Sequence, residues 1–362
     1  MLILNIEKFK YIKGRGAQIN TNNRFLKLHK VLEDDFLNYC IKEGEHYNNS
    51  KTQYLEIFPK TILNKVTSTD IGFAYSLNPY QGCEHGCIYC YARNTHEYWG
   101  YSAGLDFERK ILYKKNAAEL LEQKLKSKNW KAQNIMLSGN TDCYQPIEKK
   151  LELTRSLLTV FLKYKHPVSI ITKNTLILRD LDILTKLASL NLLHVSISIT
   201  SLEEKTRRIL EPRTASIAKR LKTVEVLSNH NIPVNVMMAP IIPAINNHEI
   251  FDLTKKVSEL GAKSVAYTMV RLNGAISEIF IDWVNKTLPD RAKKICNQIA
   301  DCHGGKLNDS RFGTRMSGEG KIAEQVHLQF RLAKKKYFSN KSLPPLDYSI
   351  YSKNTPLQLK LF

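Results

Sequence analysis

The chain has 362 residues, 43% of them hydrophobic, enough for one large barrel-type domain with extensions or for two ordinary domains. No apolar run approaches the ~20 residues that span a bilayer, and the first residues do not resemble a secretory signal, so we expect a cytoplasmic protein with no membrane partner. The formal net charge of +20 favours nucleic acid as a partner, although the excess is mainly scattered Lys rather than Arg and also fits the composition of an AT-rich genome.

Short β-branched runs alternate with helical patterns from about residue 72 to 270. Six runs bounded by turn residues predict strands at Ile71–Asn78, Asn134–Ser138, Val168–Thr172, His194–Thr200, Pro233–Ala239 and Ser264–Val270. Strands that alternate with helices imply parallel βα units with right-handed crossovers. Six such units form either an open (β/α)6 barrel or a flat doubly wound sheet, and the alternation alone does not choose between them. In both folds, sites lie at the carboxyl ends of the strands.

Apolar residues at helical spacing predict a helix after each of the first five strands. Their faces are Ala117, Leu120, Leu121 and Leu125; Leu157, Leu158, Phe161 and Leu162; Ile183, Leu184, Leu187 and Ala188; Ile217, Leu221 and Val224; and Ile250, Leu253, Val257 and Leu260. For the last of these, Asn246 and Glu249 predict a capping box and Gly261 predicts the end. Further helices are expected over 275–303 and through Ile322, Val326, Phe330 and Ala333.

The connection between the first strand and the helix at 115–126 exceeds thirty residues and shows no clear periodicity. Loops of that length inside a compact domain are usually functional. We therefore expect four parts: an N-terminal extension (1–70), a core barrel (71–275), a C-terminal helical extension with a basic glycine loop (276–343) and a flexible tail (344–362).

Three of the seven cysteines lie within this connection, in the segment NPYQGCEHGCIYCYAR. Cys83, Cys87 and Cys90 have the spacing C-x3-C-x2-C, and an odd number of cysteines in a large chain is not typical of a disulfide framework. A 4Fe-4S cluster usually takes four thiolates, so three local thiolates leave one iron with an open position for amino and carboxylate groups. The alternative is structural zinc, with His85 or His96 as the fourth ligand.

This spacing, with Tyr89 before the last cysteine, resembles the signature of the radical S-adenosyl-L-methionine (AdoMet) superfamily. The wider block from SLNPYQGCEHGCIYCYAR through THEYWG to AGLDFE resembles an uncharacterised bacterial branch grouped with spore photoproduct lyase. The resemblance extends to KGRGAQIN, SGNTDCYQPIE, LEPRTAS, APIIPAIN and RFGTRMSGEG. It departs at Asn94, where Pro is usual, and at Ala244-Ile245, where Gly-Leu is usual. The resemblance implies an α/β fold, a partial (β/α)6 TIM-type barrel.

The same resemblance implies an AdoMet pocket along the strand ends. Ser138, Asn140, Thr141 and Asp142 lie in the segment that members place against the AdoMet amino group. Lys173 and Arg213 are candidates for its carboxylate, Ser198 for its ribose, and Met238-Ala239-Pro240 for its adenine; Tyr89 belongs to the cofactor site through the cluster signature. For each position, an ordinary turn residue or a surface ion pair is the alternative.

Several other features carry alternatives. Tyr98, Trp99 and Tyr101 either stack a base or pack over the barrel. Arg311, Arg315 and the glycines between them form either a phosphate-binding nest or a structural turn. Cys302 and His303 suggest a second metal, but Cys40, Cys296 and Cys302 share no motif spacing.

We therefore predict a radical AdoMet enzyme that cleaves AdoMet reductively to a 5′-deoxyadenosyl radical, served by an external flavodoxin- or ferredoxin-like electron donor. Its substrate is unidentified, and its oligomeric state is unknown. The hypotheses are a lyase or repair-type reaction on nucleic acid, modification of a peptide or small metabolite, and a non-catalytic iron–sulfur protein that binds nucleic acid or senses redox state. Cys143, at the end of the second strand, is a candidate hydrogen-atom donor, because a non-cluster cysteine plays that part in spore photoproduct lyase; simple burial is the alternative.

Overall fold

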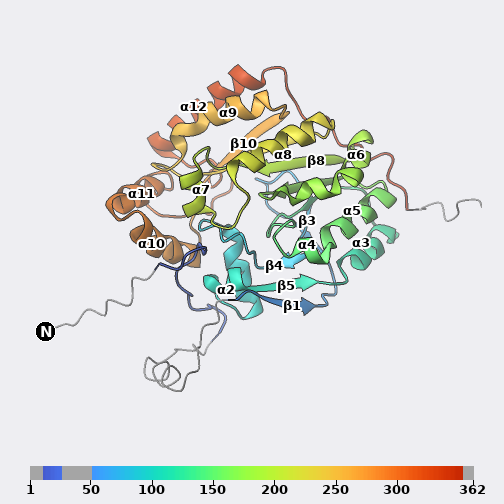
Figure 1. The fold of residues 1–362 in the computed structure, drawn as a ribbon, viewed down its shortest axis with the longest axis horizontal. Coiled ribbons are helices and arrows are strands. Elements are labelled where there is room, and N and C mark those ends of the chain that lie inside the picture. Colours follow the sequence, from blue (N-terminus) through green and yellow to red (C-terminus); the bar gives the residue numbers. More distant parts are fainter. Residues whose placement is uncertain (1–10, 27–50, 354–362) are drawn as a thin grey trace, which may run out of the picture.

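The computed structural model describes residues 11–26 and 51–353 (Figure 1). Its larger sheet has seven strands in the order β10-β9-β8-β7-β6-β3-β2. The strands are β2 (Leu63–Lys65), β3 (Tyr75–Leu77), β6 (Ile135–Leu137), β7 (Val168–Thr172), β8 (Leu193–Ser198), β9 (Val234–Ile241) and β10 (Ser264–Met269). All six predicted strands are present and parallel, and β2 adds an antiparallel strand beside β3.

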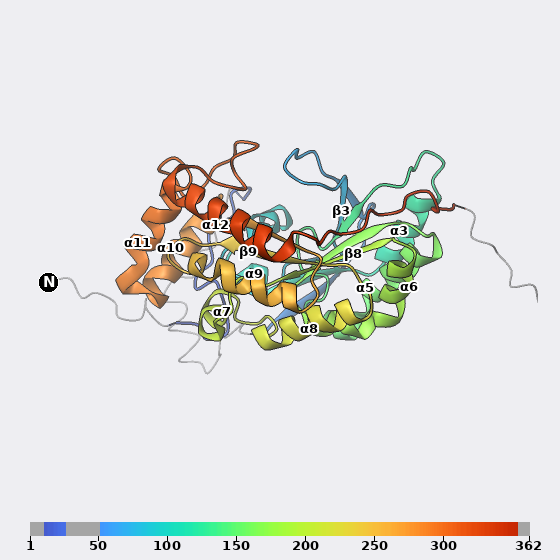
Figure 2. The same ribbon diagram turned by 90° about the horizontal axis from the view of Figure 1, so that it is seen from above.

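The six parallel strands stand side by side in chain order, with a helix in each connection. These helices are α3 (Ala117–Lys126), α5 (Leu153–Lys163), α6 (Leu181–Ser189), α8 (Ile217–Asn229) and α9 (Ile250–Glu259). Figure 2 shows α5, α6, α8 and α9 on the same side of the sheet. A doubly wound sheet would reverse its strand order and carry helices on both faces. The fold is therefore the open, six-unit barrel type, and in the described part of the chain its edge strands β2 and β10 do not pair.

The two faces of the sheet differ in chemistry because side chains alternate along each strand. Leu137, Ile170 and Val195 occupy matching positions on β6, β7 and β8 and are buried in the core beneath the helices. The inner face, opposite the helices, is polar: Asn235 of β9 donates to the hydroxyl of Ser196 on β8 at 3.1 Å. The interior of the barrel thus offers a hydrogen-bonding surface.

The long connection after β3 is more regular than its sequence predicts. It contains β4 (Tyr80–Gln81), the 3-10 helix η2 (Tyr91–Trp99), α2 (Leu105–Arg109) and β5 (Lys110–Lys114). Strands β4 and β5 pair with each other, and β5 also pairs with β1 (Gln53–Ile57), from the predicted N-terminal extension, to form a second sheet. Pairing with a remote strand leaves no local periodicity for sequence reasoning to detect.

The C-terminal helices match their predicted positions. They are α10 (Ala275–Thr287), α11 (Pro289–Asp301) and α12 (Gly320–Phe338), and the shorter helices elsewhere are α4 (Glu148–Leu151), η3 (Thr175–Asp180), α7 (Glu204–Leu210) and η4 (Asn247–Glu249). Helix α12 covers β10, where the rings of Phe330 and Tyr267 lie 4.5 Å apart. None of the helices in the described ranges is long and apolar enough to cross a membrane.

Residues 344–353, from the segment predicted as a flexible tail, lie against the amino-terminal side of the barrel strands. His194 of β8 contacts the carbonyl of Pro344 at 2.7 Å, and the amide of Asp347 donates to the carbonyl of Asn191 at 2.8 Å. Tyr351 packs against the main core. The rest of the tail lies outside the described residues.

The predicted capping box at α9 is wrong, although Gly261, with φ +90°, follows the helix as predicted. Asn246 accepts from the amide of Ile242 and donates to the carbonyls of Thr200 and Pro240. Glu249 accepts hydrogen bonds from the Ser201 hydroxyl and the Leu202 amide. Both side chains thus join the loop after β9 to the loop after β8 instead of capping the helix.

Candidate active site

Cys83, Cys87 and Cys90 lie on one irregular loop between β4 and η2, and all three are free thiols. Cys83 and Cys87 are buried, and Cys90 is partly exposed. Burial raises the pKa of Cys83, and Asp142 and the two neighbouring thiols raise it further. Cys90 packs against the buried cluster that contains Cys83 and against the one that contains Cys87, so the three thiols lie in one region. The other described cysteines belong to separate elements.

The loop is held by hydrogen bonds to segments far away in sequence. The amide of Cys83 donates to Phe107 at 2.8 Å, and the amide of Ile88 donates to Leu210 at 3.0 Å. The carbonyl of His85 accepts from the amide of Arg213 at 3.2 Å. Helix α2, the last residue of α7 and the segment that follows α7 therefore set the position of the cysteines.

A buried ion pair between Arg93 and Glu108 supports the cysteine loop. Arg93 of η2 is fully buried; it donates to the carbonyl of Cys87 at 3.0 Å and pairs with the carboxylate of Glu108 at 2.6 Å. Glu108 also accepts from the amides of Gly16 and Ala17, so the N-terminal segment KGRGAQIN belongs to this site. A Cβ atom on Gly16 would lie 1.7 Å from the carbonyl oxygen of Gly86, so only glycine permits this approach.

Asp142 connects the cysteine loop to the carboxyl end of β7. Its carboxylate pairs with His85 at 3.3 Å and accepts from the Thr172 hydroxyl and the Lys173 amide, both at 2.8 Å. Burial opposes ionisation, but His85 and these donors outweigh it and lower the pKa of Asp142 to about 2. Asp142 is therefore an ionised positioning group whose oxygens already have partners.

The remaining residues of its segment are also largely engaged. Ser138 has a φ of +76°, and its hydroxyl donates to the carbonyl of Thr141 and accepts from the amide of Cys143. The hydroxyl of Thr141 donates to the carbonyl of Tyr80 at 2.6 Å. Asn140 alone extends its side chain toward a cavity, where it donates to Thr95 at 3.1 Å. Most of the side-chain oxygens of this segment therefore shape the turn.

Lys173 and Ser198 lie side by side at the carboxyl ends of β7 and β8. Thr172 of β7 pairs with Ile197 of β8, so the next residues on the two strands are Lys173 and Ser198. Burial opposes the charge of Lys173, but Cys87 and Glu211 outweigh it and raise its pKa. The structure thus places a cation within electrostatic reach of the cysteine loop, and it has no ion-pair contact among the described residues.

Glu211 is a buried charged residue of the site that sequence reasoning missed. It is fully buried; it pairs with Arg220 of α8 and accepts hydrogen bonds from the hydroxyls of Tyr89 and Thr200. Burial would raise the pKa of Glu211, but Arg220 and Lys173 outweigh it and hold the pKa at about 2. The available signal was Arg220, because it occupies the apolar face of α8 formed by buried residues such as Ile217 and Val224. A charge on that face requires a buried partner.

Arg213 and Tyr89 both contact carboxylates beside the thiols. Arg213 is about one-third exposed, and its guanidinium lies 3.7 Å from Glu84. The hydroxyl of Tyr89 is directed to Glu211. Tyr89 thus connects the cysteine loop to Glu211, and Arg213 lies beside Glu84 of the same loop.

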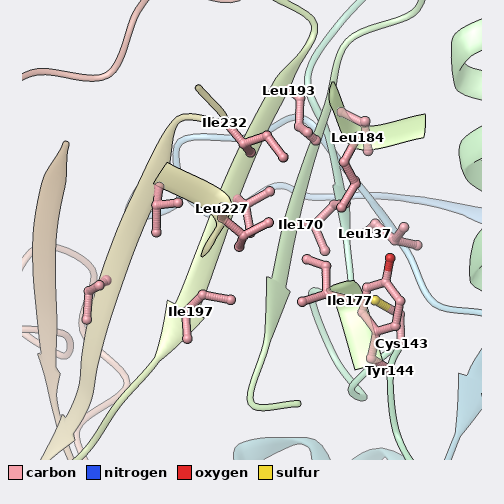
Figure 3. Close-up of a cluster of buried hydrophobic side chains, with 14 of the residues drawn as sticks. Leu137, Cys143, Tyr144, Ile170, Ile177, Leu184, Leu193, Ile197, Leu227 and Ile232 are labelled. Atoms are coloured by element: carbon pink, nitrogen blue, oxygen red, sulfur yellow. The ribbon is translucent and has the colours of Figure 1, made fainter. Parts of the chain in front are cut away.

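Cys143 is fully buried in the main core. Figure 3 shows its sulfur among Leu137, Ile177 and Tyr144. Leu137 points to the helix-covered face of the sheet, whereas a donor to a substrate radical requires access to the inner face. These surroundings are those of a packing residue.

The zinc alternative finds no support in the geometry. His85 turns toward Asp142, and His96 packs against the rings of Tyr101 and Phe107. No group of three or more His, Cys, Asp or Glu side chains in the described ranges could hold a single metal ion. A 4Fe-4S cluster requires wider spacing, because each thiolate binds a different iron. The buried Nε2 atom of His85 has no hydrogen-bond partner, which fits a loop that receives a further group.

Two other predicted features are engaged in structural contacts. The glycine loop at 310–320 is not a free nest, because the amide of Gly313 and the guanidinium of Arg315 both bind Asp70. His303 contacts the carbonyl of Val270 at 2.7 Å, and Cys302 is buried, so neither indicates a second metal. Cys40 lies outside the described residues.

Comparisons with known proteins agree with this geometry. The sequence model of the radical SAM superfamily matches residues 77–257, which include all three loop cysteines. An uncharacterised protein of Mycobacterium tuberculosis is 30% identical over 238 residues, covering 65% of this chain and 70% of that protein. The antilisterial bacteriocin subtilosin biosynthesis protein of Bacillus subtilis is 33% identical over 108 residues, covering 30% of this chain and 23% of that protein.

The fold is also similar to a solved structure. Spore photoproduct lyase complexed with dinucleoside spore photoproduct superimposes with a TM-score of 0.56 over 81% of this chain and 82% of that chain. The sequence identity is 14%, so this likeness concerns the fold alone.

The contacts of Glu108 predict that Glu108→Gln destabilises the cysteine loop. The change leaves Arg93 as a buried charge without its counter-ion, which we expect to lower the free energy of unfolding by about 3–5 kcal/mol. Urea unfolding of the cluster-free protein measures this, and the iron content after reconstitution should fall as well. Glu119→Gln, at an exposed position on α3, is the control and should change neither quantity. Equal stability of the two variants would contradict the proposed support.

Proposed function

The chain belongs to the radical SAM superfamily, and from this premise we propose that it is an enzyme that binds a 4Fe-4S cluster and AdoMet at the cysteine loop. The observation that carries the proposal is that side-chain contacts join the loop with three free thiols to Lys173, through Asp142, and to the buried carboxylate of Glu211, through Tyr89. Together these groups provide thiolate ligands and countercharges for a zwitterionic ligand.

We assign the iron ligands to Cys83, Cys87 and Cys90. When bound, a cluster with one open iron position supplies the electron that cleaves the AdoMet sulfonium to methionine and a 5′-deoxyadenosyl radical. Arg93 holds the backbone of the loop through the carbonyl of Cys87, and Asp142 holds it through His85. Both residues are positioning residues in this proposal.

We assign Lys173 to the AdoMet carboxylate, because no carboxylate of the described chain forms an ion pair with its ammonium. Ser198, next to it on the inner face, is assigned to the ribose, and Asn140 to a polar group of the ligand. Ser138 and Thr141 shape the turn, and Arg213 and Tyr89 border the site. Glu211 keeps the positive charges of Lys173 and Arg220 in place.

For the substrate, the first candidate is a lyase or repair-type reaction on nucleic acid. The net charge of +20 and the fold likeness to spore photoproduct lyase support it. The second candidate is modification of a peptide, supported by the similarity to the bacteriocin biosynthesis protein. The buried charges assembled around the cysteine loop argue against a non-catalytic iron–sulfur protein. An external flavodoxin- or ferredoxin-like protein is the proposed electron donor.

The cluster assignment predicts that protein purified without oxygen is brown and contains about four irons per chain. Replacing Cys83, Cys87 or Cys90 by Ala should remove the iron and abolish the release of 5′-deoxyadenosine. Cys296→Ala, on α11, is the matched control and should retain both. Stoichiometric zinc without iron after anaerobic reconstitution would overturn the assignment.

The assignment of Lys173 predicts weaker AdoMet binding in Lys173→Ala. Loss of one charge-assisted hydrogen bond should cost about 1.5–3 kcal/mol of binding free energy. Equilibrium dialysis with labelled AdoMet measures this in the iron-loaded protein, with exposed Lys186→Ala on α6 as the control. An unchanged dissociation constant removes Lys173 from the site.

The nucleic-acid candidate predicts binding that weakens steeply with salt. The logarithm of the binding constant should fall linearly with the logarithm of salt concentration, with a slope set by the number of phosphates contacted. Filter binding of single- and double-stranded oligonucleotides at several salt concentrations gives this slope. A slope near zero, or no binding at low salt, favours the peptide candidate.

The hydrogen-donor role of Cys143 stays a prediction, and Cys143→Ala tests it. A donor role requires that AdoMet cleavage survive while product formation fails or diverts to by-products. A packing role instead predicts a normal product yield and a loss of about 1 kcal/mol of stability from the cavity. Both quantities are measured on the same preparation.

A further inference from the structure

A cavity of about 430 Å³ opens beside the cysteine loop. Its walls come from β2, β3, β5, η2 and the turn at Gly139–Asn140. Helix η2 begins directly after Cys90, and Tyr91 at its start donates to the carbonyl of Gly139. The cavity therefore adjoins the proposed cluster and AdoMet site, although none of the assigned iron ligands lines it.

The cavity contains a buried cation without a counter-ion. Lys114 of β5 is 8% exposed and lines the cavity. Within the described residues its ammonium makes one hydrogen bond, to the carbonyl of Asn78 at 2.7 Å, and no ion pair. Burial alone lowers the pKa of Lys114 to about 8, so the side chain is still mainly charged at neutral pH. A buried ammonium with unused donors destabilises a fold unless an anion compensates it.

The remaining walls carry groups that form hydrogen bonds or stack. Amide side chains of Asn64, Asn78 and Gln81 line the cavity with hydroxyls from β3 and η2. Asn78 also accepts from the backbone amide of Asn140, and Gln81 donates to the hydroxyl of Thr95, so Asn64 is the most available of the three amides among the described residues. Trp99, 41% exposed, lies at the same cavity. Amides pair well with the edges of nucleobases, and an exposed indole offers a stacking surface. The volume falls within the range of about 300–1,000 Å³ that is usual for small-molecule sites and exceeds what a lone carboxylate needs.

We propose that this cavity binds a nucleotide unit of the substrate, with its phosphate on Lys114 and its base against Trp99 and the amide side chains. This inference rests on the proposed function, since it names the substrate class of the same site. A net charge of +20 would raise the concentration of a nucleic-acid substrate near the protein surface. The amides, the indole and the volume favour a nucleotide over an acidic peptide, which becomes an outcome of the test.

Binding of uridine 5′-monophosphate to the full-length, iron-loaded protein tests the proposal. A pyrimidine is used because adenine would compete for the AdoMet site. Equilibrium dialysis should show tighter binding of the monophosphate than of uridine, and Lys114→Met should weaken binding of the monophosphate by about 10- to 100-fold. Lys115→Met is the matched control, since Lys115 is exposed and pairs with Glu56; it should leave the affinity unchanged.

The thermal midpoint of the ligand-free protein separates this role from a structural one. A lysine kept for a ligand destabilises the empty fold, so Lys114→Met should melt at the same temperature or higher. A lysine kept for its bond to Asn78 would give a lower midpoint, which overturns the proposal. Trp99→Ala should weaken the binding of uridine 5′-monophosphate. The binding of inorganic phosphate, followed by phosphorus NMR, should stay the same.

Three further results would overturn the proposal: equal affinity for uridine and its monophosphate, no effect of Lys114→Met, or Lys114-dependent binding of an aspartate-containing dipeptide without binding of the nucleotide. AdoMet cleavage is assayed in parallel on each preparation. Cleavage without nucleotide binding means that this inference alone fails. Lys114-dependent nucleotide binding without cleavage supports the cavity assignment and counts against the proposed function.

Discussion

A loop without secondary structure must find partners for its backbone groups elsewhere, and this constraint shapes the whole molecule. Between β4 and η2, the cysteine loop satisfies its amides and carbonyls through Phe107, Leu210, Arg213 and Arg93. Phe107 belongs to α2 and Arg93 to η2. Leu210 is the last residue of α7, and Arg213 lies in the segment after it. Elements of the barrel and of the connection after β3 therefore hold this one loop together, and the N-terminal segment packs against it through Gly16 and Glu108.

Buried charges do most of the positioning. Glu108 with Arg93 supports the loop on one side, and Glu211 with Arg220 supports it on the other. A buried ion pair contributes little to net stability compared with apolar side chains of similar size, but removing one partner is costly. Such pairs therefore suit a site whose geometry must be fixed before its ligands arrive. Lys114 differs from them because its positive charge has no partner within the described chain.

The sequence predicts the barrel well because its strands and helices carry local periodicity. The six strands, the helix faces and the loop cysteines can be recognised from neighbouring residues alone, whereas Lys173 was singled out through the family resemblance. The second sheet, Glu211 and Lys114 were missed because each depends on a remote partner. Asn246 and Glu249 show the reverse error: a local pattern typical of a capping box serves long-range contacts instead. Strand position alone also did not reveal that Cys143 is buried in the main core.

The close approach of Gly16 to Gly86 has a consequence for the order in which the chain folds on the ribosome. The KGRGAQIN segment is made early, but its anchor Glu108 emerges about ninety residues later, and the loop obtains its last backbone partners only when residues 210–213 have been synthesised. Until then the three thiols are exposed on an unfinished nascent chain. The backbone framework of the proposed cluster site is thus complete only after α7 has been synthesised, late in translation or on the released polypeptide.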